Sequence, residues 1–195
     1  GYTSDALIYC LGLENVSFRS NGWYVGGMVG YNSGTVNECY VIGSISGQNN
    51  VGGLIGYNSN AAVIACSAAG SVAGTAFIGG LVGYNLSGTI NNSYATGAVN
   101  GKVSIGGLAG YNSYGTISAC YSSSPVSGSS NYAGGLIGVN NGTVTTCFAT
   151  GSVSESGNYV GGLLGYNSAD VAICYASGLV SGTGTSVGGL AGQNK

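Results

Sequence analysis

A motif of two glycines, two apolar residues, a glycine, one further residue and an asparagine recurs seven times along the chain. The copies begin at Gly26, Gly52, Gly79, Gly106, Gly134, Gly161 and Gly188, so the steps are 26, 27, 27, 28, 27 and 27 residues. Self-similarity at a fixed period of this length is typical of a solenoid, in which each structural unit stacks on the next. We therefore predict one elongated domain.

The residues of each unit favour β-strands over helices, because glycine, aromatic and β-branched residues dominate while Glu, Lys, Arg and Gln are scarce. We expect three short strands per unit. One follows the cysteine position and alternates inward and outward, as in residues 147–153. The second is Gly-Gly-Leu-Ile-Gly, and the third is Thr-Val-x, as in residues 143–145.

Three strands per unit predict an all-β fold, a parallel β-helix (β-solenoid) of about seven coils with 26–28 residues per coil. Residues 25–195 carry these repeats. Residues 1–24 depart from the pattern, and we expect them to form an irregular N-terminal coil or cap.

Matching apolar positions would stack into inward rows along the solenoid, because a single coil cannot bury them alone. Three rows are expected: Ile45, Val72, Val99, Val126, Val153 and Val180; Val36, Val63, Ile90, Ile117, Val144 and Val171; and Met28, Leu54, Leu81, Leu108, Leu136, Leu163 and Leu190.

An asparagine occupies the same position in all seven units. The predicted structural row is Asn32, Asn58, Asn85, Asn112, Asn140, Asn167 and Asn194. Stacked amides at the strand spacing can hydrogen-bond along the axis, which favours a structural role. A ligand-binding row is the alternative.

Two aromatic rows accompany the asparagines. One contains Tyr31, Tyr57, Tyr84, Tyr111 and Tyr166 and breaks at Val139 and Gln193; the other contains Tyr40, Tyr94, Tyr121, Phe148 and Tyr175 and breaks at Ser67. Aromatic rows stack to shield a sheet, and they also serve as platforms for sugars. The first interpretation is the one we favour from the sequence.

Five of the six cysteines share one repeat position: Cys39, Cys66, Cys120, Cys147 and Cys174, with Ser93 in the remaining place. Parallel side chains in neighbouring coils hold their Cβ atoms about 4.8 Å apart, farther than the ~3.8 Å typical of a disulfide. We therefore expect a row of buried, reduced thiols, with axial disulfides as the alternative.

No catalytic, metal or cofactor site is expected. The chain has no histidine, and its five acidic residues fall at different repeat phases or in distant coils. Three basic residues are too few for a stripe that would bind nucleic acid or anionic lipid, so we expect no nucleic-acid partner. No apolar run is long enough for membrane insertion by a helix.

The segments 51–59 (VGGLIGYNS), 78–85 (IGGLVGYN) and 160–168 (VGGLLGYNS) resemble the GLUG motif, and the resemblance covers roughly residues 25–195. That repeat occurs in large secreted and cell-surface bacterial proteins, including adhesin-like proteins and some immunoglobulin A peptidases. The resemblance implies a secreted or cell-surface location and transfers no catalytic residue.

The function we expect is that of a non-enzymatic structural or adhesive module of an extracellular or cell-surface protein. Alternatives remain: a subunit of a filament that assembles head-to-tail through open coil ends, an ice-binding face, or a carbohydrate-binding face. Expected partners are neighbouring coils of a longer chain, identical subunits, a surface glycan or ice. The candidate ligand-facing row is Thr35, Asn37, Thr89, Asn91, Thr116, Ser118, Thr143 and Thr145.

Overall fold

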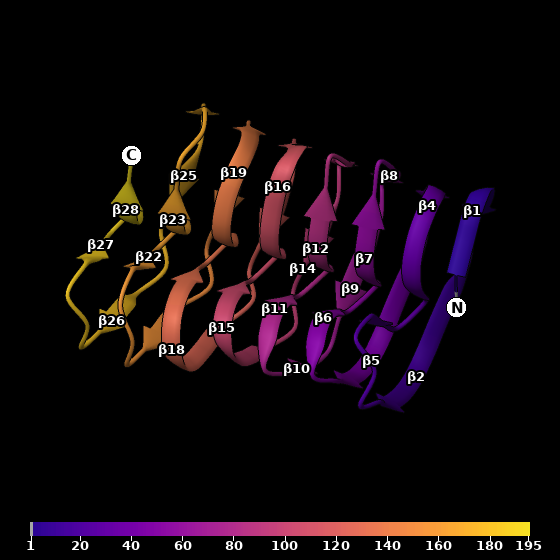
Figure 1. The fold of residues 1–195 in the computed structure, drawn as a ribbon, viewed down its shortest axis with the longest axis horizontal. Coiled ribbons are helices and arrows are strands. Elements are labelled where there is room, and N and C mark those ends of the chain that lie inside the picture. The colour runs from indigo at the N-terminus through magenta and orange to yellow at the C-terminus, as the bar shows by residue number, and fades with distance from the viewer. Residues whose placement is uncertain (1) are drawn as a thin grey trace.

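The computed structural model describes residues 2–195. Those residues form a parallel β-solenoid of 28 strands without a helix, and the coils follow one another from β1 and β2 at one end to β26, β27 and β28 at the other (Figure 1). The predicted all-β solenoid of about seven coils is confirmed. Among the described residues, no helix is long and apolar enough to cross a membrane.

The strands fall into two sheets, and every strand pairing in both sheets is parallel. The first sheet has 11 strands: β1 (Tyr2–Tyr9), β4 (Val29–Asn37), β7 (Ile55–Ser59), β8 (Ala62–Ile64), β12 (Val82–Leu86), β13 (Thr89–Asn91), β16 (Ala109–Ser118), β19 (Ile137–Thr145), β23 (Leu164–Asn167), β24 (Val171–Ala172) and β28 (Ala191–Asn194).

The second sheet has 17 strands, many of them only two or three residues long. They are β2 (Gly12–Arg19), β3 (Val25–Gly26), β5 (Tyr40–Ser46), β6 (Asn49–Gly52), β9 (Ser67–Ala69), β10 (Val72–Ala73), β11 (Ala76–Gly79), β14 (Tyr94–Ala95), β15 (Val99–Gly106), β17 (Tyr121–Ser122), β18 (Val126–Gly134), β20 (Phe148–Ala149), β21 (Val153–Glu155), β22 (Val160–Gly161), β25 (Tyr175–Ala176), β26 (Val180–Gly182) and β27 (Val187–Gly188).

The register between coils repeats the spacing of the motif. The first glycine of each motif pairs with the first glycine of the next, from Gly26 with Gly52 through to Gly161 with Gly188. Where coil length changes, the pairing shifts between strand segments, for example between Gly101 and Val103 and between Ser113 and Thr116. Strands on either side of a shift keep the same face inward, because a one-residue slip within a strand would invert its faces.

Residues 2–19 stack on the first repeat. Strand β1 pairs with β4 and β2 pairs with β5, each with one irregularity in register. In this coil Leu11, rather than Cys10, lies at the cysteine position, since the Leu11 N–H points at Cys39 Sγ at 3.4 Å.

The corner between the two sheets is made by the glycine pair of each motif. The prediction of one strand through Gly-Gly-Leu-Ile-Gly is wrong. Strand β6 ends at Gly52, the chain turns at Gly53 and Leu54, and β7 begins at Ile55. A Cβ on Gly52 would overlap the Ile55 carbonyl oxygen, and one on Gly53 would overlap the Gly80 carbonyl oxygen of the next coil. Only glycine allows this close approach of backbones.

Other corners are made by non-glycine residues with positive φ. One such corner precedes the apolar residue that leads into five of the glycine pairs, and φ there is 45° at Asn50, 55° at Phe77, 52° at Ser104, 65° at Tyr132 and 62° at Tyr159. The left-handed conformation is uncommon for aromatic residues. These five residues occupy the same place in five successive coils.

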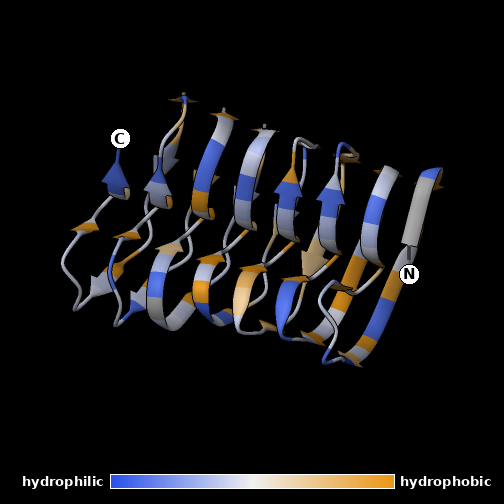
Figure 2. Ribbon diagram, in the orientation of Figure 1, coloured by the Kyte–Doolittle hydropathy of each residue, from blue (hydrophilic) through white to orange (hydrophobic). Residues whose placement is uncertain are grey.

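Two stacks of apolar side chains fill the interior. One is built around the leucine row and the other around residues such as Val51 and Val72. Strand pairings and inter-coil hydrogen bonds confirm the register of the three predicted apolar rows. Their members are buried except toward the ends of the solenoid, where Met28, Val171 and Val180 are partly buried and Leu190 is exposed. Hydrophobic and hydrophilic segments consequently recur at matching places in successive coils (Figure 2).

Candidate functional site

The asparagine side chains form a buried, hydrogen-bonded row behind the first sheet. Asn58 Nδ2 donates to Asn85 Oδ1 at 2.8 Å, and Asn85 Nδ2 donates to Asn112 Oδ1 at the same distance. The amides from Asn32 to Asn167 also close the turn in their own coil, as when Asn85 Nδ2 donates to the Gly88 carbonyl at 3.0 Å. Equivalent links join the whole row: Asn32, Asn58, Asn85, Asn112, Asn140, Asn167 and Asn194. Residues in the middle of the row are 0% exposed, so they cannot contact a ligand at the surface.

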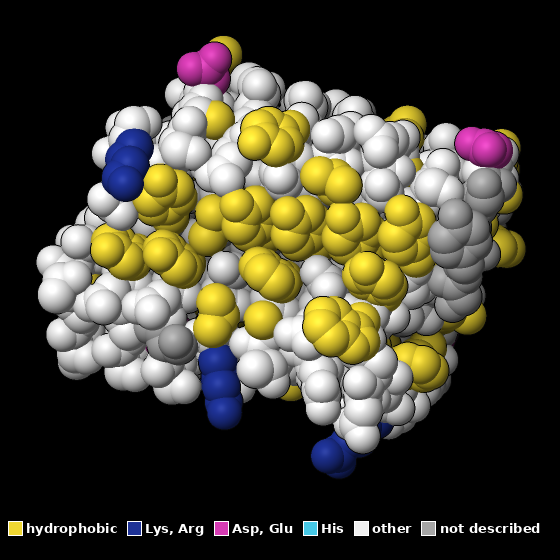
Figure 3. All heavy atoms as spheres, viewed as in Figure 1, with side chains coloured by type: hydrophobic (Ala, Val, Ile, Leu, Met, Phe, Trp, Pro, Cys, Tyr) yellow, Lys and Arg dark blue, Asp and Glu magenta, His cyan; other side chains and the backbone are white. Residues whose placement is uncertain are grey.

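The tyrosine row lies one residue earlier and faces outward from the same strands. Ring centroids are 5.3 Å apart between Tyr31 and Tyr57, 5.1 Å between Tyr57 and Tyr84, and 4.9 Å between Tyr84 and Tyr111, with nearly parallel planes. Figure 3 shows a continuous apolar band across the face that carries β4, β7, β12, β16 and β19. Partial burial is the first cause that raises the pKa of Tyr57, followed by its tyrosine neighbours.

A second aromatic row runs along the other sheet. The rings of Tyr94, Tyr121, Phe148 and Tyr175 are stacked, with centroids 4.8 to 5.0 Å apart. Ser67 takes the place of a ring between Tyr40 and Tyr94. The molecule therefore presents two aromatic surfaces on different sheets, and each has a break.

The threonine row lies on the first sheet beyond the turn that follows the asparagines. Thr89, Thr116 and Thr143 are exposed and in register, but Ala62 separates Thr35 from them, and Asp170 follows Thr143 in the next coil. The residues two positions after these threonines form a parallel row. In it, Asn91 Nδ2 donates to Ser118 Oγ at 2.7 Å, and Asn37 and Thr145 occupy matching positions. These interruptions divide the surface, and ice binding by this row stays a prediction.

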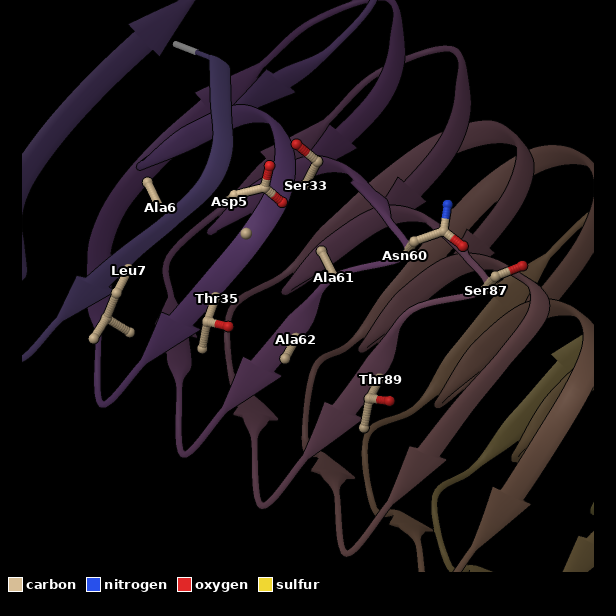
Figure 4. A pocket seen from close by; sticks show the side chains of 11 residues that line it. Asp5, Ala6, Leu7, Ser33, Thr35, Asn60, Ala61, Ala62, Ser87 and Thr89 are labelled. Atoms are coloured by element: carbon tan, nitrogen blue, oxygen red, sulfur yellow. The ribbon is translucent and has the colours of Figure 1, made fainter.

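The first hollow lies beside Ala62, where the threonine row is interrupted. It has a volume of about 540 Å³, and Figure 4 shows Thr35, Ala62 and Thr89 along one side, with Asp5 and Asn60 near the turn. Small residues form its floor, and the hollow is open to solvent. It offers hydroxyl groups, and none of the described residues that line it is aromatic.

The second hollow lies where Val139 interrupts the tyrosine row. It has a volume of about 590 Å³ and is lined by Phe77, Val103, Ser104, Tyr111, Tyr132, Val139, Asn141, Tyr159, Tyr166, Ser168, Gln193 and Lys195. Asn141 Nδ2 donates to the Tyr111 hydroxyl at 2.6 Å, and Ser168 Oγ donates to Asn141 Oδ1 at 2.7 Å. Five aromatic rings and a connected polar rim therefore surround this hollow.

The cysteine row lies at the corner where the chain passes from the first sheet to the second, as between β8 and β9. Cys39, Cys66, Cys120 and Cys147 are buried, Cys174 is partly buried, and all are free thiols. The Cys66 thiol donates to the Ile64 carbonyl at 3.1 Å, and Ser93 makes the equivalent bond to Asn91 at 2.8 Å. Burial raises the pKa of the Cys66 thiol to about 11, so this group stays protonated at neutral pH.

No three or more cysteine, aspartate, glutamate or histidine residues in the part of the chain that the structure describes are placed to hold a metal ion. Cys10 lies apart from the cysteine row at the surface, where its thiol donates to a Glu38 carboxylate oxygen at 3.1 Å.

The GLUG motif matches three adjacent segments of the chain, residues 47–73, 78–100 and 101–127. Residues 47–127 are GLUG repeats. No curated protein and no solved structure matches the chain. GLUG repeats are associated with extracellular bacterial proteins, and on this solenoid they form a structural repeat module.

The second hollow depends on a pair of positions that the repeat pattern does not bring together. Val139 is visible in the sequence as a break in the tyrosine row of the GLUG-like units. Its neighbour Ser104 is 35 residues earlier in the chain and belongs to the row of corner residues. A comparison of those corner positions between units is the signal that would have revealed the second break.

Proposed function

We propose that this chain is a non-enzymatic, adhesive module of an extracellular or cell-surface bacterial protein. The observation that carries the proposal is the aromatic band on the first sheet, which stands on a rigid scaffold of stacked coils. Contiguous apolar surface with polar edges is typical of interaction sites, and tyrosine combines a large apolar ring with a hydroxyl group. The association of GLUG repeats with extracellular bacterial proteins supports the location.

Low charge is consistent with this role. The chain has three basic and five acidic residues among 195, so long-range electrostatic attraction contributes little to any encounter. Contact with a partner would then depend on ring faces and hydroxyl groups, which act only at short range.

Adhesion of bacteria that display the chain tests the proposal. Displaying cells are expected to adhere to epithelial cell layers, matrix-coated wells or polysaccharide beads more strongly than cells displaying an unrelated chain. The double variant Tyr57→Ser and Tyr84→Ser should lose most of that adhesion. The matched control, Tyr94→Ser and Tyr121→Ser, alters stacked rings on the other sheet and should retain it.

If the displaying cells adhere to none of these surfaces, the adhesive role is contradicted. Equal losses of adhesion in the two double variants would contradict it as well. Antibody labelling of intact cells of the source bacterium tests the location, since an intracellular protein would stay unlabelled. The head-to-tail filament stays a prediction, which electron microscopy of the purified chain would test.

A further inference from the structure

The hollow at Val139 is formed where the tyrosine row and the row of corner residues both lack a ring, at Val139 and at Ser104. The corner residue of one coil lies beside the tyrosine-row position of the next coil, as shown by Phe77 and Tyr111, whose centroids are 5.7 Å apart, and by Tyr132 and Tyr166, at 5.9 Å. Between these two ring pairs, the corresponding positions hold Ser104 and Val139. The aromatic surface therefore lacks one complete pair of rings at this point.

Backbone packing places these two small residues side by side. A Cβ on Gly138, immediately before Val139, would lie 2.6 Å from the Ser104 carbonyl carbon. Ser104 is 3% exposed and Val139 is 6% exposed, so both form the floor of the hollow rather than its rim. The walls are the rings of the flanking pairs.

The gap has the dimension of one six-membered ring. Strands in neighbouring coils are about 4.8 Å apart, so Tyr111 and Tyr166, two coils apart, are separated by roughly 10 Å along the axis. Stacked rings elsewhere in the same row have centroids 4.9 to 5.3 Å apart. One six-membered ring inserted midway between Tyr111 and Tyr166 would therefore restore the spacing of the row.

The polar rim distinguishes between kinds of ring. The Tyr111 hydroxyl accepts a hydrogen bond from Asn141, which leaves its own proton to donate to a bound group, and Ser168 completes the chain of polar contacts. A purely aromatic ligand would cover these groups without pairing them, which costs free energy. A pyranose ring has C–H faces for the tyrosines and hydroxyl groups at its edge for the rim.

We propose that this hollow binds a saccharide, with one pyranose ring inserted between Tyr111 and Tyr166 and its hydroxyl groups bonded to the rim of Tyr111, Asn141 and Ser168. The inference rests on the proposed adhesive function, because it names the ligand class of that aromatic surface. The first hollow, beside Ala62, has no aromatic ring among its described lining residues and is not assigned a ligand.

The test uses the full chain and an array of trisaccharides of glucose, mannose, galactose and N-acetylglucosamine, followed by calorimetric titration with the trisaccharide that gives the strongest signal. The informative variant is Val139→Tyr, which fills the gap with the residue that five of the seven units carry at that position. The matched control is Ser67→Tyr, which fills the break in the other aromatic row. Both variants should unfold at or above the temperature of the parent chain.

The expected result is measurable binding by the parent chain, at least about tenfold weaker binding by Val139→Tyr, and unchanged binding by Ser67→Tyr. Absence of binding to every trisaccharide would overturn the proposal. Equal binding by Val139→Tyr would overturn the site, and binding of indole or a proline-rich peptide in place of sugars would overturn the ligand class.

Cell adhesion separates this inference from the proposed function. If cells displaying Val139→Tyr adhere as well as the parent while the Tyr57 and Tyr84 double variant does not, the adhesive role stands and the saccharide site is overturned as its cause. If the purified chain binds a trisaccharide at this hollow but displaying cells do not adhere, the site stands and the adhesive role fails.

Discussion

Two adjacent residues of every unit, a tyrosine and the asparagine after it, show opposite tolerance to change. The asparagine is present in all seven units, while the tyrosine gives way to Val139 and Gln193. Asn140 and Val139 lie next to each other on the same strand: the side chain of Asn140 is in the interior row of amides, and Val139 forms part of the floor of the second hollow. The two positions differ in tolerance because the asparagine is hydrogen-bonded to other coils, whereas the tyrosine is only stacked on them.

An interior amide is bonded to two other coils and to its own turn, so a change in one coil leaves buried polar groups without partners in others. A surface ring contributes stacking with its neighbours, and its loss leaves only a gap that solvent or a ligand fills. The asparagine row is therefore needed to hold the coils together, whereas positions in the tyrosine row can change and give the surface a binding site.

The largest effect is expected from Asn85→Leu. This change removes the acceptor for Asn58 and the donor for Asn112 in a buried row. Unsatisfied buried groups cost about 1–3 kcal/mol each, so the free energy of unfolding should fall by about 2–6 kcal/mol. Urea unfolding measures the change, and a loss below about 1 kcal/mol would show that the amide row contributes little.

A smaller effect is expected from Tyr84→Val, the neighbouring residue on the outer side. The change removes stacking with Tyr57 and Tyr111 and copies the residue found naturally at Val139. Aromatic pairs contribute about 0.5–1.5 kcal/mol each, and partial exposure keeps the loss near 1 kcal/mol in urea unfolding. A loss as large as that of Asn85→Leu would remove the distinction between the two rows.

The smallest effect at neutral pH is expected from Cys66→Ser, because Ser93 already makes the same bond in the next coil. The pKa of Cys66 is raised to about 11, chiefly by burial, from an ordinary value of 9.0. Its contribution is fully present below about pH 9 and declines as the pH rises toward 11, because the unfolded thiol ionises first. Urea unfolding at pH 8, 9.5 and 10.5 should show a steeper decline for the parent than for Cys66→Ser; equal slopes would contradict the shift.

The period of the motif was sufficient to predict the number of coils and the register, because a fixed repeat leaves one way to stack identical rows. Strand boundaries were less predictable. Gly53 and Leu54 lie in an apolar run that suggests a strand, yet they form a corner, since the close approach of the Gly80 backbone is set by the next coil. Likewise, the predicted strand over residues 147–153 alternates as expected but is divided between β20 and β21.

The second hollow was less predictable than the fold for a related reason. The break at Val139 is visible in the repeat alignment, whereas its adjacency to Ser104 depends on the offset between the corner of one coil and the strand of the next. Such offsets come from the path of the backbone around the coil. They are not encoded in the period.

The hydrogen bonds between coils run nearly parallel to the long axis, from backbone and asparagine amides alike. Tension applied along that axis therefore pulls these bonds in the direction in which they separate, and each coil is held only by its neighbours. Under load the solenoid would yield one coil at a time, so its mechanical strength is set by the weakest junction between coils and does not increase with the number of repeats.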